Sequence, residues 1–102
     1  MNIDITKKGQ TLQLTIQGSI GEKEADILKQ RFRENSLDDV NEVILDMDKV
    51  THLGSSGIGK LILIYKDITF KSGQLKLINT PPGIYESLIH IKFDKIFSIS
   101  KS

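Results

Sequence analysis

Residues 43–59 read VILDMDKVTHLGSSGIG, a stretch that joins an apolar run to a segment rich in glycine and serine. It opens with Val43, Ile44 and Leu45, a short apolar run rich in β-branched residues, which predicts a central strand covered on both faces. Residues 54–59 (GSSGIG) then open a helix, which Ser72 and Gly73 end. The inner stripe predicted for this helix comprises Ile58, Leu61, Ile62, Tyr65 and Ile68.

Upstream of this stretch, apolar and polar residues alternate in two short runs. Residues 3–6 and 11–17 predict a β-hairpin with one buried face, and residues 8–10 (KGQ) supply its turn. Residues 19–22 (SIGE) have the S-x-x-E form of a capping box, so a helix is predicted from there to about Asn35. The residues that this helix should bury are Ala25, Leu28 and Phe32.

Downstream, the pattern predicts a strand, a helix and a last short strand. Residues 74–79 alternate with Leu75 and Leu77 on one face. A helix can begin at residues 81–82 (PP), because proline is tolerated in the first turn. Its apolar positions are Ile84, Leu88 and Ile91, and residues 96–99 alternate again. The order ββαβαβαβ predicts one α/β domain over residues 1–102, with a mixed β-sheet covered by helices.

Composition excludes several classes of function. The chain has 14 basic and 13 acidic residues, a net charge of +1 without a basic cluster, so nucleic acid is not an expected partner. Cysteine is absent, and His52 and His90 are far apart in sequence, so no metal site is expected. No signal-peptide pattern and no apolar run of ~20 residues is present, which predicts a soluble cytoplasmic protein without a membrane segment.

Three other side chains have structural interpretations. Asp46, which shares a strand face with Asp48, is predicted to accept hydrogen bonds from backbone N–H groups of the following loop rather than to act in acid–base chemistry. Tyr65 and Phe70 lie at helical positions and are expected in the core.

Residues 54–60 (GSSGIGK) invite two nucleotide-binding interpretations. They match G-x-x-x-x-G-K, but a P-loop needs Ser or Thr next, where this chain has Leu61. About six residues also separate Asp46 from Gly54, whereas a P-loop follows its strand directly. The segment SSGIG resembles the turn of short-chain dehydrogenases, but the glycine spacing is one residue short and no Tyr-x-x-x-Lys pair follows.

The stretch as a whole resembles the signature of STAS domains, the anti-sigma factor antagonists and their relatives in sulfate transporters. The matching residues are 43–47 (VILDM), Val50, Leu53 and 55–59 (SSGIG). The N-terminal hairpin, the helix after Gly18, residues 75–81 (LKLINTP) and residues 93–97 (FDKIF) follow in family order. The resemblance therefore covers nearly the whole chain.

This resemblance implies a regulatory switch without enzymatic activity or cofactor. It places the phosphoacceptor at Ser55, with Ser56 as the alternative, and the docking surface at Gly21, Gly54, Ser55, Ser56, Gly57 and Ile58. The implied partners are an anti-sigma factor serine kinase and a PP2C-type phosphatase. A helix N-terminus tolerates a phosphate because its N–H groups are free and its potential is positive. Gly57 and Gly59 would keep the approach open, or would only permit close packing of the helix on the sheet.

Two positions depart from the family pattern. Gly54 replaces the Asp before the acceptor, and Gly21 replaces the acidic residue common after the second strand. One alternative is therefore a non-phosphorylatable STAS scaffold or complex subunit, including one of a transporter, and another is a small P-loop-like nucleotide binder. Ser55 or Ser56 could also be only an N-cap, which stabilises a helix by ~1 kcal/mol. Relatives usually continue beyond the position of Ser102 into a closing helix.

Overall fold

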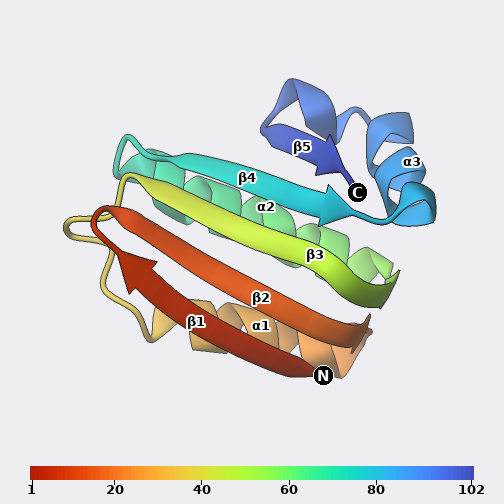
Figure 1. The fold of residues 1–102 in the computed structure, drawn as a ribbon, viewed down its shortest axis with the longest axis horizontal. Helices are drawn as coiled ribbons and strands as arrows, with labels where there is room; N and C mark the ends of the chain where they lie inside the picture. Colours follow the sequence, from red (N-terminus) through yellow and green to blue (C-terminus); the bar gives the residue numbers. More distant parts are fainter.

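The predicted N-terminal hairpin is present and forms one side of a five-stranded sheet (Figure 1). Strand β1 (Asn2–Lys8) pairs antiparallel with β2 (Thr11–Ile20). Gly9 makes the turn with a φ of 58°, a conformation that glycine adopts without steric cost. The computed structural model describes all residues from 1 to 102.

The other three strands run parallel to β2 and complete a mixed sheet in the order β1-β2-β3-β4-β5. They are β3 (Glu42–Leu53), β4 (Gln74–Thr80) and β5 (Ser98–Lys101). The element order ββαβαβαβ and the central position of β3 are both confirmed. Parallel neighbours follow from the helices between them, because each crossover returns the chain to the same end of the sheet.

Two long helices lie side by side on one face of the sheet, and a short third helix lies beyond the end of β4 (Figure 1). They are α1 (Glu22–Arg33), α2 (Ser55–Phe70) and α3 (Pro82–His90). Strand β3 alternates accordingly: Val43 and Leu45 are fully buried, whereas Ile44 and Asp46 are half-buried. The prediction that both faces of β3 are covered is therefore wrong, because β-branched residues also suit a sheet with one open face.

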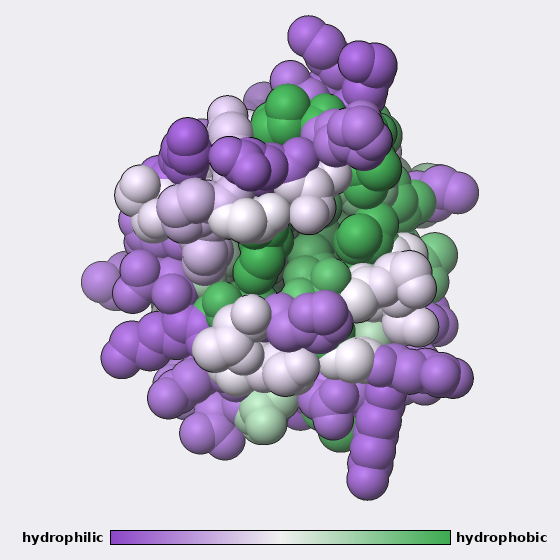
Figure 2. Space-filling model, turned by 90° about the vertical axis from the view of Figure 1, so that its right-hand side faces the viewer, coloured by the Kyte–Doolittle hydropathy of each residue, from purple (hydrophilic) through white to green (hydrophobic).

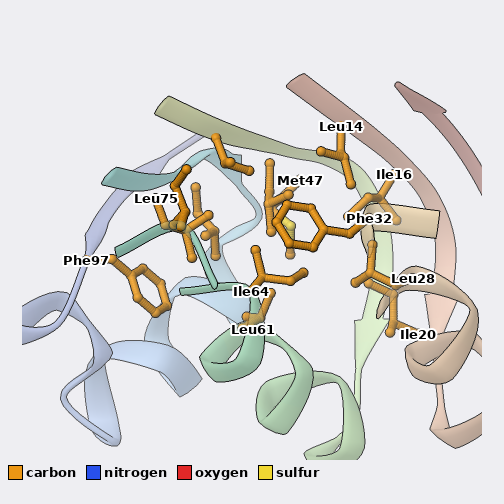
Figure 3. Packing of buried hydrophobic residues seen from close by; sticks show 14 of the residues in the cluster. Leu14, Ile16, Ile20, Leu28, Phe32, Met47, Leu61, Ile64, Leu75 and Phe97 are labelled. Atoms are coloured by element: carbon orange, nitrogen blue, oxygen red, sulfur yellow. The ribbon is translucent and has the colours of Figure 1, made fainter. Parts of the chain in front are cut away.

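One apolar core fills the space between the sheet and the two long helices. Figure 3 shows Leu28 and Phe32 of α1 and Leu61 and Ile64 of α2 directed at the strands. Ala25, Leu28 and Phe32 are buried as predicted, and so are Leu75 and Leu77. The predicted stripe of α2 missed Ile64, which is fully buried; Ile58, Ile62 and Tyr65 are only partly buried but still pack against the core.

The start of α1 differs from the predicted capping box. Strand β2 continues to Ile20, so Gly21 and not Ser19 is the N-cap. Glu24, three residues later, accepts a 3.1 Å hydrogen bond from the backbone N–H of Gly21. Glycine has no side chain to return the bond, so only this half of a capping box is formed.

Three apolar residues near the ends of helices or strands, Phe70, Ile91 and Ile96, lie in other places than predicted. Phe70, predicted in the core, is 87% exposed, and Ile91 is 43% exposed. Both stand where their helix ends, beyond the turns that face the sheet. A short 3-10 helix, η1 (Phe93–Lys95), also precedes the last strand, so β5 begins at Ser98 rather than at Ile96.

Candidate partner-binding site

The starts of α1 and α2 lie next to each other because β2 and β3 are parallel neighbours that end together. Ile20 at the end of β2 pairs with Leu53 at the end of β3. Gly21 and Gly54 follow these residues directly and are the N-caps of α1 and α2. The sheet thus brings together two positions that are far apart in the chain.

Gly54 is the single residue between β3 and α2, which makes Ser55 the first residue of the helix. The Ile58 N–H donates to the Gly54 carbonyl over 3.0 Å, as the first turn of a helix requires. The N–H groups of residues 55–57 precede this bond and point out of the helix end. Ser55 is exposed and Ser56 is half-buried.

The interpretation of Ser55 or Ser56 as an N-cap is wrong. The cap position belongs to Gly54, and no side chain caps the helix. The first turn of α2 also contains no acidic residue. The serine hydroxyls are therefore left at the helix start, in a region of positive potential that no carboxylate of α2 offsets.

Gly57 and Gly59 have different roles: the close packing that was one alternative for both is found at Gly57 alone, whereas the space beside Gly59 is open. A Cβ atom at Gly57 would lie 2.5 Å from Cδ1 of Leu53 and 3.0 Å from Cγ2 of Ile20, so the absence of a side chain permits close helix-to-sheet packing. A Cβ atom at Gly59 would meet nothing within 4 Å. Gly57 is buried, so its predicted place in an exposed docking surface does not agree with the structure.

The P-loop interpretation does not fit the backbone. Strand β3 reaches Leu53, so the expected gap of about six residues between the strand and Gly54 is wrong. Residues 55–59 are helical, however, and form no loop that could surround a phosphate. Lys60 pairs instead with Asp26 of α1, with 3.2 Å between Nζ and Oδ1. Ion pairing between α1 and α2 is the observed role of this lysine.

A hollow of about 280 Å³ lies beside the start of α2 and was not predicted from the sequence. Its apolar lining comes from Leu53, Ile58 and Ile84, and its polar lining includes His52 and Ser87. Figure 2 views this end of the molecule, where apolar surface is visible among more hydrophilic residues. Ile84 and Ser87 belong to α3, which follows the parallel strand β4 and therefore reaches the same end of the sheet.

The remaining candidates have structural roles. Asp46 accepts hydrogen bonds from the backbone N–H of Asp48 at 3.1 Å and from Nδ2 of Asn79 at 3.2 Å; the predicted backbone bond exists, but within β3 rather than to a loop. His52 and His90 are both exposed. No group of three or more His, Cys, Asp or Glu residues is close enough to hold a metal ion. None of the helices has both the length and the apolar character that crossing a bilayer requires.

The family model described as "STAS domain" matches residues 2–102. The chain belongs to the STAS domain family. This membership agrees with the observed mixed sheet and its three helices, and it confirms the resemblance drawn from residues 43–59.

Solved structures of anti-sigma factor antagonists share the fold. A putative anti-sigma factor antagonist from Thermotoga maritima is 18% identical in sequence. The match covers 98% of this chain and 86% of the Thermotoga chain, with a TM-score of 0.88. An anti-sigma factor antagonist from Mycobacterium paratuberculosis is 20% identical. The match covers 99% of this chain and 86% of the Mycobacterium chain, with a TM-score of 0.83. The Bacillus cell fate determinant SpoIIAA in its phosphorylated form is 12% identical, with 99% and 93% covered and a TM-score of 0.72.

Proposed function

We propose that this STAS domain is a regulatory module that binds a partner protein through the start of α2, as an anti-sigma factor antagonist-like switch. One observation carries the proposal: Ser55 is exposed at the first position of α2, directly after Gly54, whose backbone N–H is bonded to the end of β2. The docking surface comprises Gly21, Gly54, Ser55, Ser56 and Ile58, with Gly57 packed beneath it.

Phosphorylation of Ser55 is the proposed control of this surface. A serine kinase would transfer the γ-phosphoryl group of its own ATP to Oγ of Ser55, which loses its proton. The resulting group carries about −2 charge and is stabilised by the free N–H groups and the positive potential of the helix start. The same bulky dianion would prevent a closely packed partner from docking, so phosphorylation lowers affinity.

The partner that best fits this control is a serine-kinase anti-sigma factor in the cytoplasm. In its unphosphorylated state the domain would occupy the anti-sigma factor and release the sigma factor. A PP2C-type phosphatase would hydrolyse the phosphoserine and restore binding. The domain itself needs no cofactor and performs no turnover in this scheme, because the ATP belongs to the kinase.

The test is incubation with the cognate kinase and ATP, followed by intact-mass measurement. We expect the wild-type chain and Ser56→Ala to gain one phosphoryl group and Ser55→Ala to gain none. Ser100→Ala, at an exposed position of β5, is the matched control. A wild-type chain that gains no phosphate contradicts the switch, and a phosphorylated chain that binds its partner undiminished contradicts the mechanism of control.

The two glycine N-caps favour a second candidate, a STAS scaffold or complex subunit that is not phosphorylated. The family resemblance implies acidic residues where this chain has Gly21 and Gly54, so the surface lacks charges that a kinase could recognise. In this case the kinase adds no phosphate, yet the partner still binds and Ile58→Asp abolishes binding. Calorimetry with ATP, GTP and NAD tests the nucleotide-binding alternative, for which micromolar affinity would be decisive.

A further inference from the structure

A second surface lies at the end of the molecule opposite to Ser55, where α1 and α2 end and β3 and β4 begin (Figure 1). Phe70, the last residue of α2, is 87% exposed there, whereas the other exposed large apolar side chains are between 38% and 43% exposed. Single exposed apolar residues are ordinary on proteins. An aromatic ring this open beside a hollow, however, is typical of an interface anchor.

The hollow beside Phe70 has a volume of about 590 Å³ and is the largest on the molecule. Its apolar lining consists of Phe32, which is buried at the end of α1, and Leu37, which is partly buried in the following loop, together with Phe70 itself. The other lining residues are polar or charged, so a projecting ring and a recess with a small apolar part occupy the same surface. This combination can bind a copy of itself, because a two-fold interface uses one patch on both molecules.

The charges around the hollow are balanced in a way that suits a second copy. Arg33 at the end of α1 donates to both carboxylate oxygens of Asp67 on α2, at 2.9 and 3.2 Å. Lys71 after α2 lies 3.5 Å from Asp38 in the loop after α1. Each side of the surface thus carries one base and one acid. When a two-fold axis places the α1 side against the α2 side, every base faces an acid.

We propose that this surface mediates weak self-association as a two-fold dimer, in which Phe70 of each copy enters the hollow of the other. We call it the Phe70 surface; its residues are Phe32, Arg33, Leu37, Asp38, Asp67, Phe70 and Lys71. Helix α2 has 16 residues and spans about 24 Å, so the dimer leaves both Ser55 ends free. The proposal does not depend on the proposed function of Ser55.

Sedimentation equilibrium tests the dimer on the whole chain. Between about 10 µM and about 1 mM, the range in which weak dimers dissociate, we expect the wild-type mass to rise from 11.4 kDa towards twice that value. Phe70→Ala should stay monomeric over the same range. Its fold should be intact because the ring is outside the core, and a thermal melt monitored by circular dichroism checks this. Ile27→Ala, an apolar truncation on α1 that is 39% exposed and outside the hollow, should dimerise like the wild type.

Charge exchange gives a second test of the same interface. Arg33→Asp removes the pair with Asp67 of its own chain and also places an acid opposite Asp67 of the other copy, so we expect dimerisation to weaken about tenfold or more. Combining it with Asp67→Arg restores one base and one acid and should recover the wild-type association. A wild-type chain that is monomeric throughout the range overturns the proposal. So does a Phe70→Ala variant that dimerises as well as the wild type.

Discussion

The backbone N–H of Gly54 donates a 3.0 Å hydrogen bond to the carbonyl oxygen of Ile20, which joins the start of α2 to the end of β2. Because this bond is made by backbone atoms, it does not depend on which side chain occupies position 54. Ser55 should therefore keep its place when position 54 is changed. Substitutions there can separate the charge of the site from its geometry.

Gly54→Asp should stabilise the domain. The backbone at Gly54 has φ −81° and ψ 175°, which any residue adopts, and a Cβ atom would lie 3.6 Å from the nearest atom. An Asp N-cap accepts a hydrogen bond from the helix start and favours its dipole, so we expect a gain of roughly 0.3–1 kcal/mol in the free energy of unfolding. Urea denaturation at neutral pH measures it. Gly54→Asn, which caps without charge, should gain less, and no gain with Asp would refute the capping argument.

Replacing Gly57 or Gly59 of α2 by alanine should change the free energy of unfolding in opposite directions. Gly59→Ala fills open space in an exposed turn and should stabilise by about 0.5–1 kcal/mol. Gly57→Ala forces its Cβ atom against Leu53 and the fully buried Ile20, and should destabilise by about 1 kcal/mol after the helix-propensity gain is subtracted. Thermal unfolding of the two variants side by side checks this. Equal shifts would show that Gly57 is not a packing glycine.

The order of elements could be predicted because each depends on local signals. The alternation in residues 11–17 and the paired prolines at the start of α3 act within a few residues, and both elements were found. The face that α2 buries could not be predicted as well, since apolar residues occupy every position from Leu61 to Tyr65. Ile64 is buried and Phe70 exposed because of where α1 and the sheet lie, which is tertiary information.

The candidate site could be predicted only in part, because some of its residues come together only through the fold. Ser55 and Gly54 lie in one contiguous motif, so their proximity needs no knowledge of the fold. The hollow beside them includes Gly83, Ile84 and Ser87 of α3, which reach it only through the parallel pairing of β3 and β4. The different roles of Gly57 and Gly59 likewise depend on atoms of Ile20, which is distant in sequence.

Thr80 offers a stability test in the core. It is fully buried at the end of β4, and its Oγ1 atom has no hydrogen-bond partner. Burying an unsatisfied hydroxyl costs ~1–3 kcal/mol, so Thr80→Val, which keeps the shape, should stabilise by about 1 kcal/mol. Thr80→Ser keeps the hydroxyl but removes the methyl group and should destabilise. Chemical denaturation compares the pair, and a destabilised valine variant would mean that the hydroxyl is bonded in solution.

The ion pair between Glu42 and Lys76 should make the free energy of unfolding depend on pH in the acidic range. Nζ of Lys76 lies 2.7 Å from Oε2 of Glu42, and this hydrogen bond lowers the pKa of Glu42 below its ordinary value of 4.5. The pKa of Glu42 is lower in the folded chain than in the unfolded chain. The stabilisation by the Glu42–Lys76 pair is therefore fully present above about pH 4.5 and is lost as the pH falls through the folded-state pKa. A partly exposed pair of this kind contributes roughly 0.2–1 kcal/mol.

Lys76→Met should therefore raise the pKa of Glu42 towards its ordinary value and reduce the loss of stability on acidification. Carbon-13 NMR titration of the Glu42 carboxyl group measures the first effect, and urea unfolding at several acidic pH values measures the second. Lys66→Met, a change at an exposed lysine on α2, is the matched control and should leave the Glu42 titration unchanged. If the Glu42 pKa is the same with and without Lys76, the carboxylate is held by some other group, and the hydroxyl of Thr11, 3.3 Å from Oε1, is the next to remove.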